Sequence, residues 1–285
     1  MRVRLVASSL LLVSLGLFGC GDVPGAGNGG PGADTPRDVG PGAPDPGTDD
    51  PSDETPEPTA VRHVAPEGDD GADGSEATPW RTVAHAVANA KPGMKIVVAA
   101  GTYAGFTVDA VDGTADAPIV VAGAGAGAEG ARPIFGTPVV VSRAHWVLDG
   151  IEVASAEPAF SVRFTGAGSH DNVLRNSVVR DGTGAAGVSI DLEASKITVE
   201  SSEIFNISRG ETDAHGIVVQ PTVRDVTLIG NDIHDNSGDS IQCIGPGQDA
   251  VEGAPANNVV IEGITFPRIS TFSQCLMSMA FSRFA

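Results

Sequence analysis

Side chains suited to metal binding and acid–base catalysis gather between residues 209 and 242, just before two predicted strands. One strand begins at Ile217 and the other begins at Ile241. Carboxylates supply the oxygen ligands that calcium prefers, and imidazole transfers protons near neutral pH. These residue types indicate a metal site with an acid–base partner. The group comprises Arg209, Glu211, Asp213, His215, Asp232, His234, Asp235 and Asp239.

Counting back two residues from each strand start puts His215 and Asp239 at equivalent positions on successive strands. Parallel strands lie about 4.8 Å apart, so this imidazole and this carboxylate come within reach of each other. We expect Asp213, Asp235 and Asp239 to hold calcium, with loop carbonyls and substrate completing its roughly six to eight oxygen ligands. The alternative is that these residues are solvated turns, because Asp and Asn readily bond to their own backbone.

A repeated apolar pattern would position these groups. An apolar residue is followed three positions later by Asn or a small residue, and two positions further by a second apolar residue. The first members lie 25, 26, 29 and 33 residues apart, which is about one coil of a parallel β-helix each. We expect Asn176, Ser202 and Asn231 to form an internal hydrogen-bonded ladder. The five segments assigned to this apolar pattern are Leu148-Ile151-Val153, Val173-Asn176-Val178, Val199-Ser202-Ile204, Leu228-Asn231-Ile233 and Ile261-Ile264-Phe266.

A second set of strands interleaves with the first, at Phe160-Val162, Val188-Ile190, Ile217-Val219 and Ile241-Cys243. Alternation at period two turns these side chains inward. It leaves Ser189, Asp191, Val218, Gln220 and Gln242 facing outward. The sequence therefore predicts an all-β solenoid. A β-sandwich is the alternative that the composition allows, but the regular spacing disfavours it.

The sequence predicts that residues 62–103 form a cap for the solenoid. A short strand at His63–Ala65 precedes a Gly/Asp loop, and Thr82 caps a short amphipathic helix that ends at Pro92-Gly93. The segment resembles the amino-terminal cap of extracellular right-handed β-helix proteins, including the family 9 and family 6 polysaccharide lyases. The matching elements are VAPEGDDGADGSEATPW, then KPG before a buried strand, and VAAGTY after it.

This resemblance implies a single-stranded right-handed parallel β-helix with a short N-terminal capping helix. It also implies a groove on the outward faces of the central coils, acidic calcium ligands and a basic residue that drives β-elimination in acidic polysaccharide. From spacing, Arg209 would receive the sugar carboxylate or act as the base, and His215 would relay the proton. We expect calcium-dependent binding with weak or absent cleavage. The alternative is a non-catalytic carbohydrate-binding or surface-adhesion module.

The amino terminus has the features of an export signal. Arg2 and Arg4 precede an apolar run, and Leu17-Phe18-Gly19-Cys20 resembles the lipobox of bacterial lipoproteins. The sequence predicts a signal peptide over residues 1–20, lipidation of Cys20 and a lipid-anchored protein in the cell envelope, at the outer membrane or cell surface. An ordinary secretory signal is the alternative. Residues 21–60 hold nine Pro and nine Gly, so we expect a disordered linker ahead of a body over 61–285.

Charge and motifs exclude several classes of partner. The net charge of −19 divides into +2 for the signal, −8 for the linker and −13 for the body. An acidic body argues against nucleic acid and against adsorption to anionic membrane. Residues 125–130 match GxGxxG, but Pro133 and a strand at Val139–Val141 follow where a nucleotide site needs a helix. We therefore expect no nucleotide, and no disulfide between Cys243 and Cys275.

The carboxy-terminal segment departs from the coil pattern. No Asp or Glu follows Glu262, and Phe and Met crowd into residues 272–285. We expect the segment 267–285 to be truncated or frame-altered. The alternative is an amphipathic cap made by Phe272, Leu276, Met279 and Phe281.

Overall fold

The computed structural model describes residues 56–125, 132–244 and 258–265. The predicted signal peptide with Cys20, nearly all of the predicted linker and the segment 267–285 lie outside these residues. No helix within the described ranges is long and apolar enough to cross a membrane.

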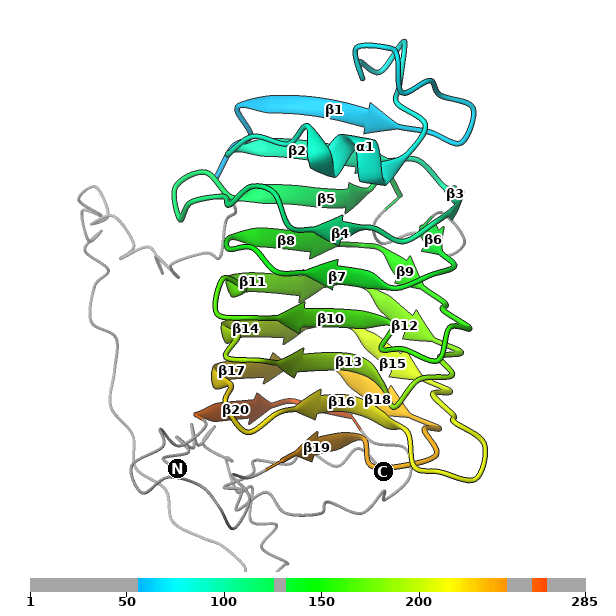
Figure 1. The fold of residues 1–285 in the computed structure, drawn as a ribbon, viewed down its shortest axis with the longest axis vertical. Helices are drawn as coiled ribbons and strands as arrows, with labels where there is room; N and C mark the ends of the chain where they lie inside the picture. Colours follow the sequence, from blue (N-terminus) through cyan, green and yellow to red (C-terminus); the bar gives the residue numbers. More distant parts are fainter. Residues whose placement is uncertain (1–55, 126–131, 245–257, 266–285) are drawn as a thin grey trace, which may run out of the picture. The chain divides into compact units, whose positions relative to one another are not determined.

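Three parallel sheets build the described body, and after the first strand of sheet A each full coil adds one strand to each sheet in the order A, B, C (Figure 1). Sheet A contains β1 (Ala60–Val64), β2 (Met94–Val98), β5 (Ile119–Gly123), β8 (Trp146–Asp149), β11 (His170–Arg175), β14 (Ser195–Glu200), β17 (Arg224–Ile229) and β20 (Val259–Glu262). Sheet B contains β3 (Gly101–Tyr103), β6 (Pro133–Phe135), β9 (Glu152–Val153), β12 (Val178–Arg180), β15 (Glu203–Phe205) and β18 (Asp232–His234). Sheet C contains β4 (Thr107–Val108), β7 (Val139–Val141), β10 (Val162–Thr165), β13 (Ala186–Asp191), β16 (His215–Val219) and β19 (Ile241–Cys243). The all-β, single-stranded right-handed parallel β-helix is confirmed.

The parallel register stacks apolar residues of the same position into continuous rows inside the solenoid. Leu148, Leu174 and Val199 form such a row in sheet A, and all three are fully buried. Because each buried apolar side chain contributes roughly 1.5–3 kcal/mol, these rows hold the coils together. The predicted inward strands of sheet C are confirmed in the register Val162, Val188, Ile217 and Ile241. The prediction for Phe160 was wrong, because β10 begins at Val162 and its inward pair is Val162 and Phe164.

The predicted polar ladder exists, but one of its residues was wrong. The backbone N–H of Ile151 donates to Ser177 Oγ at 3.3 Å, that of Ser177 to Ser202 Oγ at 3.2 Å, and that of Ser202 to Asn231 Oδ1 at 3.0 Å. Ser177 therefore occupies the rung assigned to Asn176. Asn176 is instead exposed, with φ at 50°.

A register error of one residue explains this correction. The inward residues of that coil are Leu174 and Val179, whereas the apolar pattern placed Val173 and Val178 there. Both positions are adjacent apolar pairs, so the pattern fits either register. Asn176 occupies the left-handed corner position that Gly150, Ser201 and Gly230 hold in neighbouring coils. Asn tolerates that conformation better than most residues, which is a second role that its identity could have indicated.

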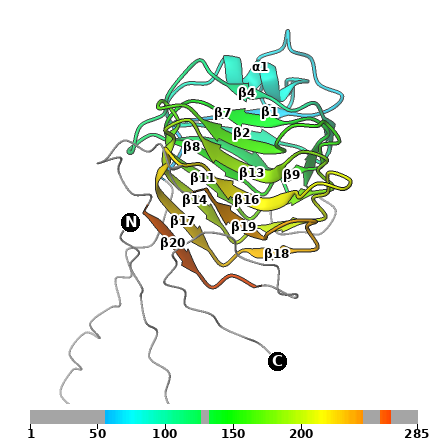
Figure 2. The same ribbon diagram turned by 60° about the horizontal axis from the view of Figure 1, so that its bottom comes forward.

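A short helix, α1 (Val83–Ala88), caps one end of the solenoid, and β20 lies toward the other end (Figure 2). Thr82 accepts a hydrogen bond from the backbone N–H of His85 at 3.1 Å, so the predicted helix cap is confirmed. Asp70 in turn accepts bonds from the backbone N–H groups of Arg81 and Thr82. Burial raises the pKa of Asp70, but these bonds outweigh it and lower that pKa. The buried residues of the helix itself are Val83, Ala86 and Val87.

Two minor predictions fall partly outside the described residues. Most of the GxGxxG segment is among residues 126–131, and the chain continues at Pro133 as strand β6. Cys243 is buried in β19, and Cys275 lies in the segment that the structure does not describe.

Candidate functional site

The structure brings His215 and Asp239 together, as the sequence predicted. His215 Nδ1 lies 3.7 Å from Asp239 Oδ2 and accepts a hydrogen bond from the Asp239 backbone N–H at 3.0 Å. Both residues are buried, and both lie two positions before the inward residues Ile217 and Ile241. The pair consequently faces the interior of the solenoid. Its role as a proton relay stays a prediction.

The other predicted site residues are dispersed. Arg209 is exposed, and its Nε donates to Thr212 Oγ1 at 3.1 Å. Asp213 is exposed on the loop before β16, and Asp235 is an exposed corner residue with φ at 52°. Within the described ranges, Asp213, Asp235 and Asp239 are not among the groups whose ligand atoms lie within 4.8 Å of one another. Their role as calcium ligands stays a prediction.

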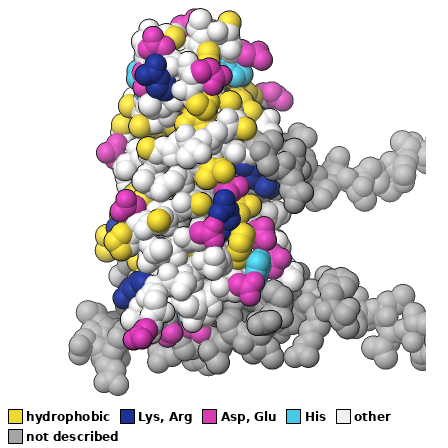
Figure 3. Space-filling model, turned by 90° about the vertical axis from the view of Figure 1, so that its right-hand side faces the viewer, with side chains coloured by type: hydrophobic (Ala, Val, Ile, Leu, Met, Phe, Trp, Pro, Cys, Tyr) yellow, Lys and Arg dark blue, Asp and Glu magenta, His cyan; other side chains and the backbone are white. Residues whose placement is uncertain are grey.

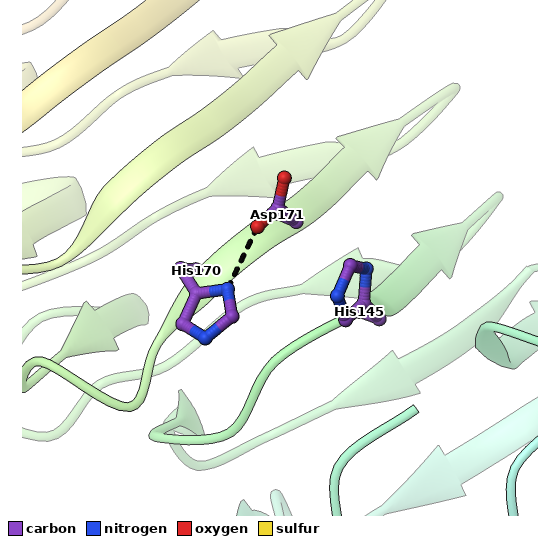
Figure 4. Close-up of side chains that lie close together, drawn as sticks. All are labelled: His145, His170 and Asp171. Atoms are coloured by element: carbon purple, nitrogen blue, oxygen red, sulfur yellow. Dashed lines mark hydrogen bonds and ion pairs between the residues drawn. The ribbon is translucent and has the colours of Figure 1, made fainter. Parts of the chain in front are cut away.

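Two other groups of His and acidic residues could hold a metal ion. The first comprises His145, His170 and Asp171 (Figure 4), and the second comprises Glu203, Asp232 and His234. All six residues are partly exposed. Asp232 and His234 were predicted from the sequence to lie near the candidate site, and the other four residues were not predicted.

The first group belongs to a column of polar residues at the corner where sheet C passes into sheet A. Consecutive coils place His145, Asp171, Lys196 and Asp225 there, with φ values of 57°, 54°, 51° and 55°. We call these four residues the corner column. A left-handed conformation at four non-glycine residues is uncommon, and the flanking strands hold each of them in place. Their side chains consequently stack along the solenoid axis.

Contacts within the corner column fix the Asp171 carboxylate. Asp171 Oδ2 lies 2.7 Å from His170 Nδ1, and Asp171 Oδ1 lies 3.5 Å from Lys196 Nζ. The rings of His145 and His170 meet edge to face, with centroids 5.6 Å apart (Figure 4). Burial raises the pKa of Asp171, but the His170 hydrogen bond and the charges of Lys196 and His145 outweigh it and lower that pKa. The carboxylate is thus held in its ionised form.

A cleft of about 350 Å³ opens beside this carboxylate on the outer face of sheet A. Asp171, Lys196 and Asp225 line it from the corner column. Its floor carries Val173, Thr198 and Thr227, which are paired in register across β11, β14 and β17. Asn172 completes the lining. The cleft therefore presents a cation, carboxylates and hydroxyls on three successive coils.

The second group lies on the outer face of sheet B, where acidic side chains surround basic and histidine side chains (Figure 3). His234 Nε2 lies 3.2 Å from Glu203 Oε1, and His234 Nδ1 lies 2.9 Å from Asp235 Oδ2. Burial opposes the imidazolium, but these two bonds outweigh it and raise the pKa of His234. The ring also stacks on Phe205 at 5.0 Å. Both imidazole nitrogens are therefore already committed to carboxylates.

Asp232 completes this group with an atypical carboxylate. Its Oδ1 atom is buried and has no hydrogen-bond partner among the described residues. Burial raises the pKa of Asp232, and the charge of Glu203 acts in the same direction against the opposing effect of His234. The second group is consequently an ion-pair network with one poorly solvated oxygen.

The outer face of sheet C carries a different arrangement. Arg163 makes a bidentate ion pair with Asp191, with Nε–Oδ2 at 2.8 Å and Nη2–Oδ1 at 3.2 Å. Ser189 Oγ donates to the same carboxylate at 3.0 Å. Ser189, Asp191 and Val218 alternate outward as predicted but are buried. This carboxylate is therefore fully engaged with neighbouring side chains.

One signal in the sequence could have revealed the corner column. Its members lie 26, 25 and 29 residues apart, which is the spacing of the stacked core residues Leu148, Leu174, Val199 and Leu228. The residue types differ along the column, so a search for repeated identities does not detect it. A search for polar residues at the coil spacing would.

The fold is that of a parallel β-helix protein, and it resembles the fold of polysaccharide lyases. Residues 66–111 match the family described as a protein of unknown function, DUF1565. The solenoid is similar to the crystal structure of pectate lyase Pel9A, with a TM-score of 0.54 and 20% identity over 76% of this chain and 58% of that one. It is also similar to a rhamnogalacturonan lyase, with a TM-score of 0.50 and 15% identity over 75% of this chain and 65% of that one.

These similarities establish the fold. The chain spans less than two thirds of the length of either lyase. No curated protein matches the sequence.

Proposed function

We propose that this chain binds a polysaccharide that contains uronic acids, in the cleft on the outer face of sheet A. The similar structures support this proposal, because one is named a pectate lyase and the other a rhamnogalacturonan lyase. Both names refer to acidic polysaccharides. The protein is itself strongly acidic, so a carboxylated chain needs a local cation to bind.

The observation that carries the proposal is the position of Lys196 in the cleft. Lys196 follows Asp171 and precedes Asp225 in the corner column, its ammonium group lies 3.5 Å from Asp171 Oδ1, and it lines the same cleft as Thr198 and Thr227. Lys196 can pair with a sugar carboxylate, and the two hydroxyls can hydrogen-bond to ring substituents. Because the coils repeat at about 4.8 Å, these groups form a row that an extended sugar chain can follow.

A second candidate function is β-elimination, the reaction that we expected from the resemblance to lyases. One observation favours it, namely that His145 and His170 lie beside the Lys196–Asp171 pair. In this reaction a cation neutralises the uronate carboxylate and a base removes the proton from the adjacent carbon. Lys196 and a neutral imidazole would supply those two roles.

Calcium and envelope anchoring remain parts of the proposal. Asp213, Asp235 and Asp239 would need to move toward one another to share one ion, since Asp239 faces inward and the other two are exposed. Lipidation of Cys20 would hold the protein at the cell envelope. Replacing Cys20 with Ala should release it from the membrane fraction, and unchanged fractionation would contradict the anchor.

Titration with polygalacturonate tests the proposed function. We expect Lys196→Ala to weaken binding about tenfold, which corresponds to roughly 1.4 kcal/mol. Lys91→Ala is the matched control, because Lys91 is an exposed lysine in the N-terminal cap. Equal affinity of the two variants would refute the role of the cleft. Ultraviolet absorption by an unsaturated uronate product, measured in the same samples, would distinguish elimination from binding alone.

A further inference from the structure

His145 is the least engaged imidazole of the corner region. Within the described residues its ring makes no hydrogen bond, and it meets the ring of His170 edge to face. Each of His145, His170 and Asp171 nevertheless offers a ligand atom within 4.8 Å of the other two. Figure 4 shows the three side chains converging from the starts of β8 and β11.

We propose that His145, His170 and Asp171 bind a divalent transition-metal ion of borderline softness, such as zinc. Two imidazoles and one carboxylate suit zinc and its neighbours, whereas calcium takes about six to eight oxygen ligands. Three protein ligands leave a coordination position open. The proposed site adjoins the cleft, because Asp171 belongs to both.

The fold prepares the ligands for this role. His145 and Asp171 are both left-handed corner residues, and the strands that follow them are paired in register through Val147 and Val173. The partly exposed setting lets an ion enter from solvent.

Lys196 sets a limit on the affinity of this site. Its ammonium lies 3.5 Å from Asp171 Oδ1 and therefore repels a cation bound by the same carboxylate. Removing this charge should strengthen metal binding. The same change weakens polysaccharide binding under the proposed function, so the two ideas make opposite predictions for one variant. The metal site does not rest on the proposed function.

The group on sheet B provides the internal control. His234 already meets a carboxylate at each ring nitrogen and would have to lose both bonds before it bound a metal through either one. His234→Gln is thus a matched histidine substitution that leaves the proposed site intact.

Calorimetric titration of zinc into the untagged, metal-stripped full chain tests the inference. We expect one ion per chain, at least tenfold weaker binding in His145→Gln and in His170→Gln, unchanged binding in His234→Gln, and tighter binding in Lys196→Met. His145→Gln is the decisive variant, because the His145 ring makes no hydrogen bond with the described residues and its loss should not unfold the protein.

Three results would overturn the metal site. These are the absence of stoichiometric zinc binding, equal zinc affinity in wild type and His145→Gln, and calcium binding as tight as zinc. Polysaccharide binding that persists in any of these cases would leave the proposed function standing.

Discussion

Two columns of polar residues flank sheet A, one at each end of its strands. Both follow the coil repeat, but they have different roles. At the end of the sheet, Ser177, Ser202 and Asn231 are buried, and each accepts a backbone N–H of the preceding coil. At the start of the sheet, the corner column is partly or fully exposed and adjoins a cleft. A buried polar group must be fully paired, whereas an exposed one keeps bonding capacity for a ligand. One repeat thus provides a structural ladder at one corner and a candidate binding site at the other.

Disrupting the buried ladder should have the largest effect on stability. Asn231 accepts from the Ser202 N–H and donates to the Val199 carbonyl at 2.8 Å, and it is fully buried. Asn231→Ala leaves both backbone groups unpaired, so we expect a loss of about 2–4 kcal/mol in the free energy of unfolding. Denaturant titration measures it.

The control for that variant is Asn176→Ala, which tests the corrected register. Asn176 is exposed, and its side chain donates to Asp149 Oδ1 at 2.9 Å. We expect a loss of about 1 kcal/mol, mainly from its left-handed conformation. A larger loss for Asn176→Ala than for Asn231→Ala would reverse the assignment of the ladder.

A smaller, pH-dependent effect should come from the ion-pair network on sheet B. The pKa of His234 is raised above its ordinary value of 6.5, so the imidazolium stabilises the fold below pH 6.5. That stabilisation is lost as the pH rises through the raised pKa. We expect His234→Gln to lower the free energy of unfolding by no more than about 1 kcal/mol near pH 6, since Glu203 and Asp235 are substantially exposed.

Melting curves of wild type and His234→Gln across a pH series measure this difference. The gap should narrow as the pH rises above 6.5. A constant gap at every pH would show that the ring acts through packing on Phe205 and not through its charge.

The sequence contained enough information for the fold because the coil spacing is repeated by large apolar residues. It could not fix the register where two apolar residues are adjacent, as at Val173-Leu174 and Val178-Val179, since only three-dimensional packing selects between them. The contact between His215 and Asp239 followed directly from strand register. Their inward direction was missed because the count from the strand starts was not combined with alternation at period two.

The corner column was missed for a different reason. Its residues share a position in the coil but not a chemical type, and His145 is isolated in the sequence from the other ionisable residues of the site. His170 and Asp171 are adjacent in sequence, yet only the turn of one whole coil brings His145 beside them. Such a site depends on the stacking of coils, which a local motif does not encode.

The most direct test of the account is a hydrogen-exchange footprint of the full chain with and without polygalacturonate. The central claim is that ligand binds at the start of sheet A. We predict slower exchange at the starts of β11, β14 and β17, near Asp171, Lys196 and Asp225, with no change at residues 209–215. Slower exchange confined to residues 209–215 and the start of β16 would contradict the claim and favour the site built on Arg209, Asp213 and His215.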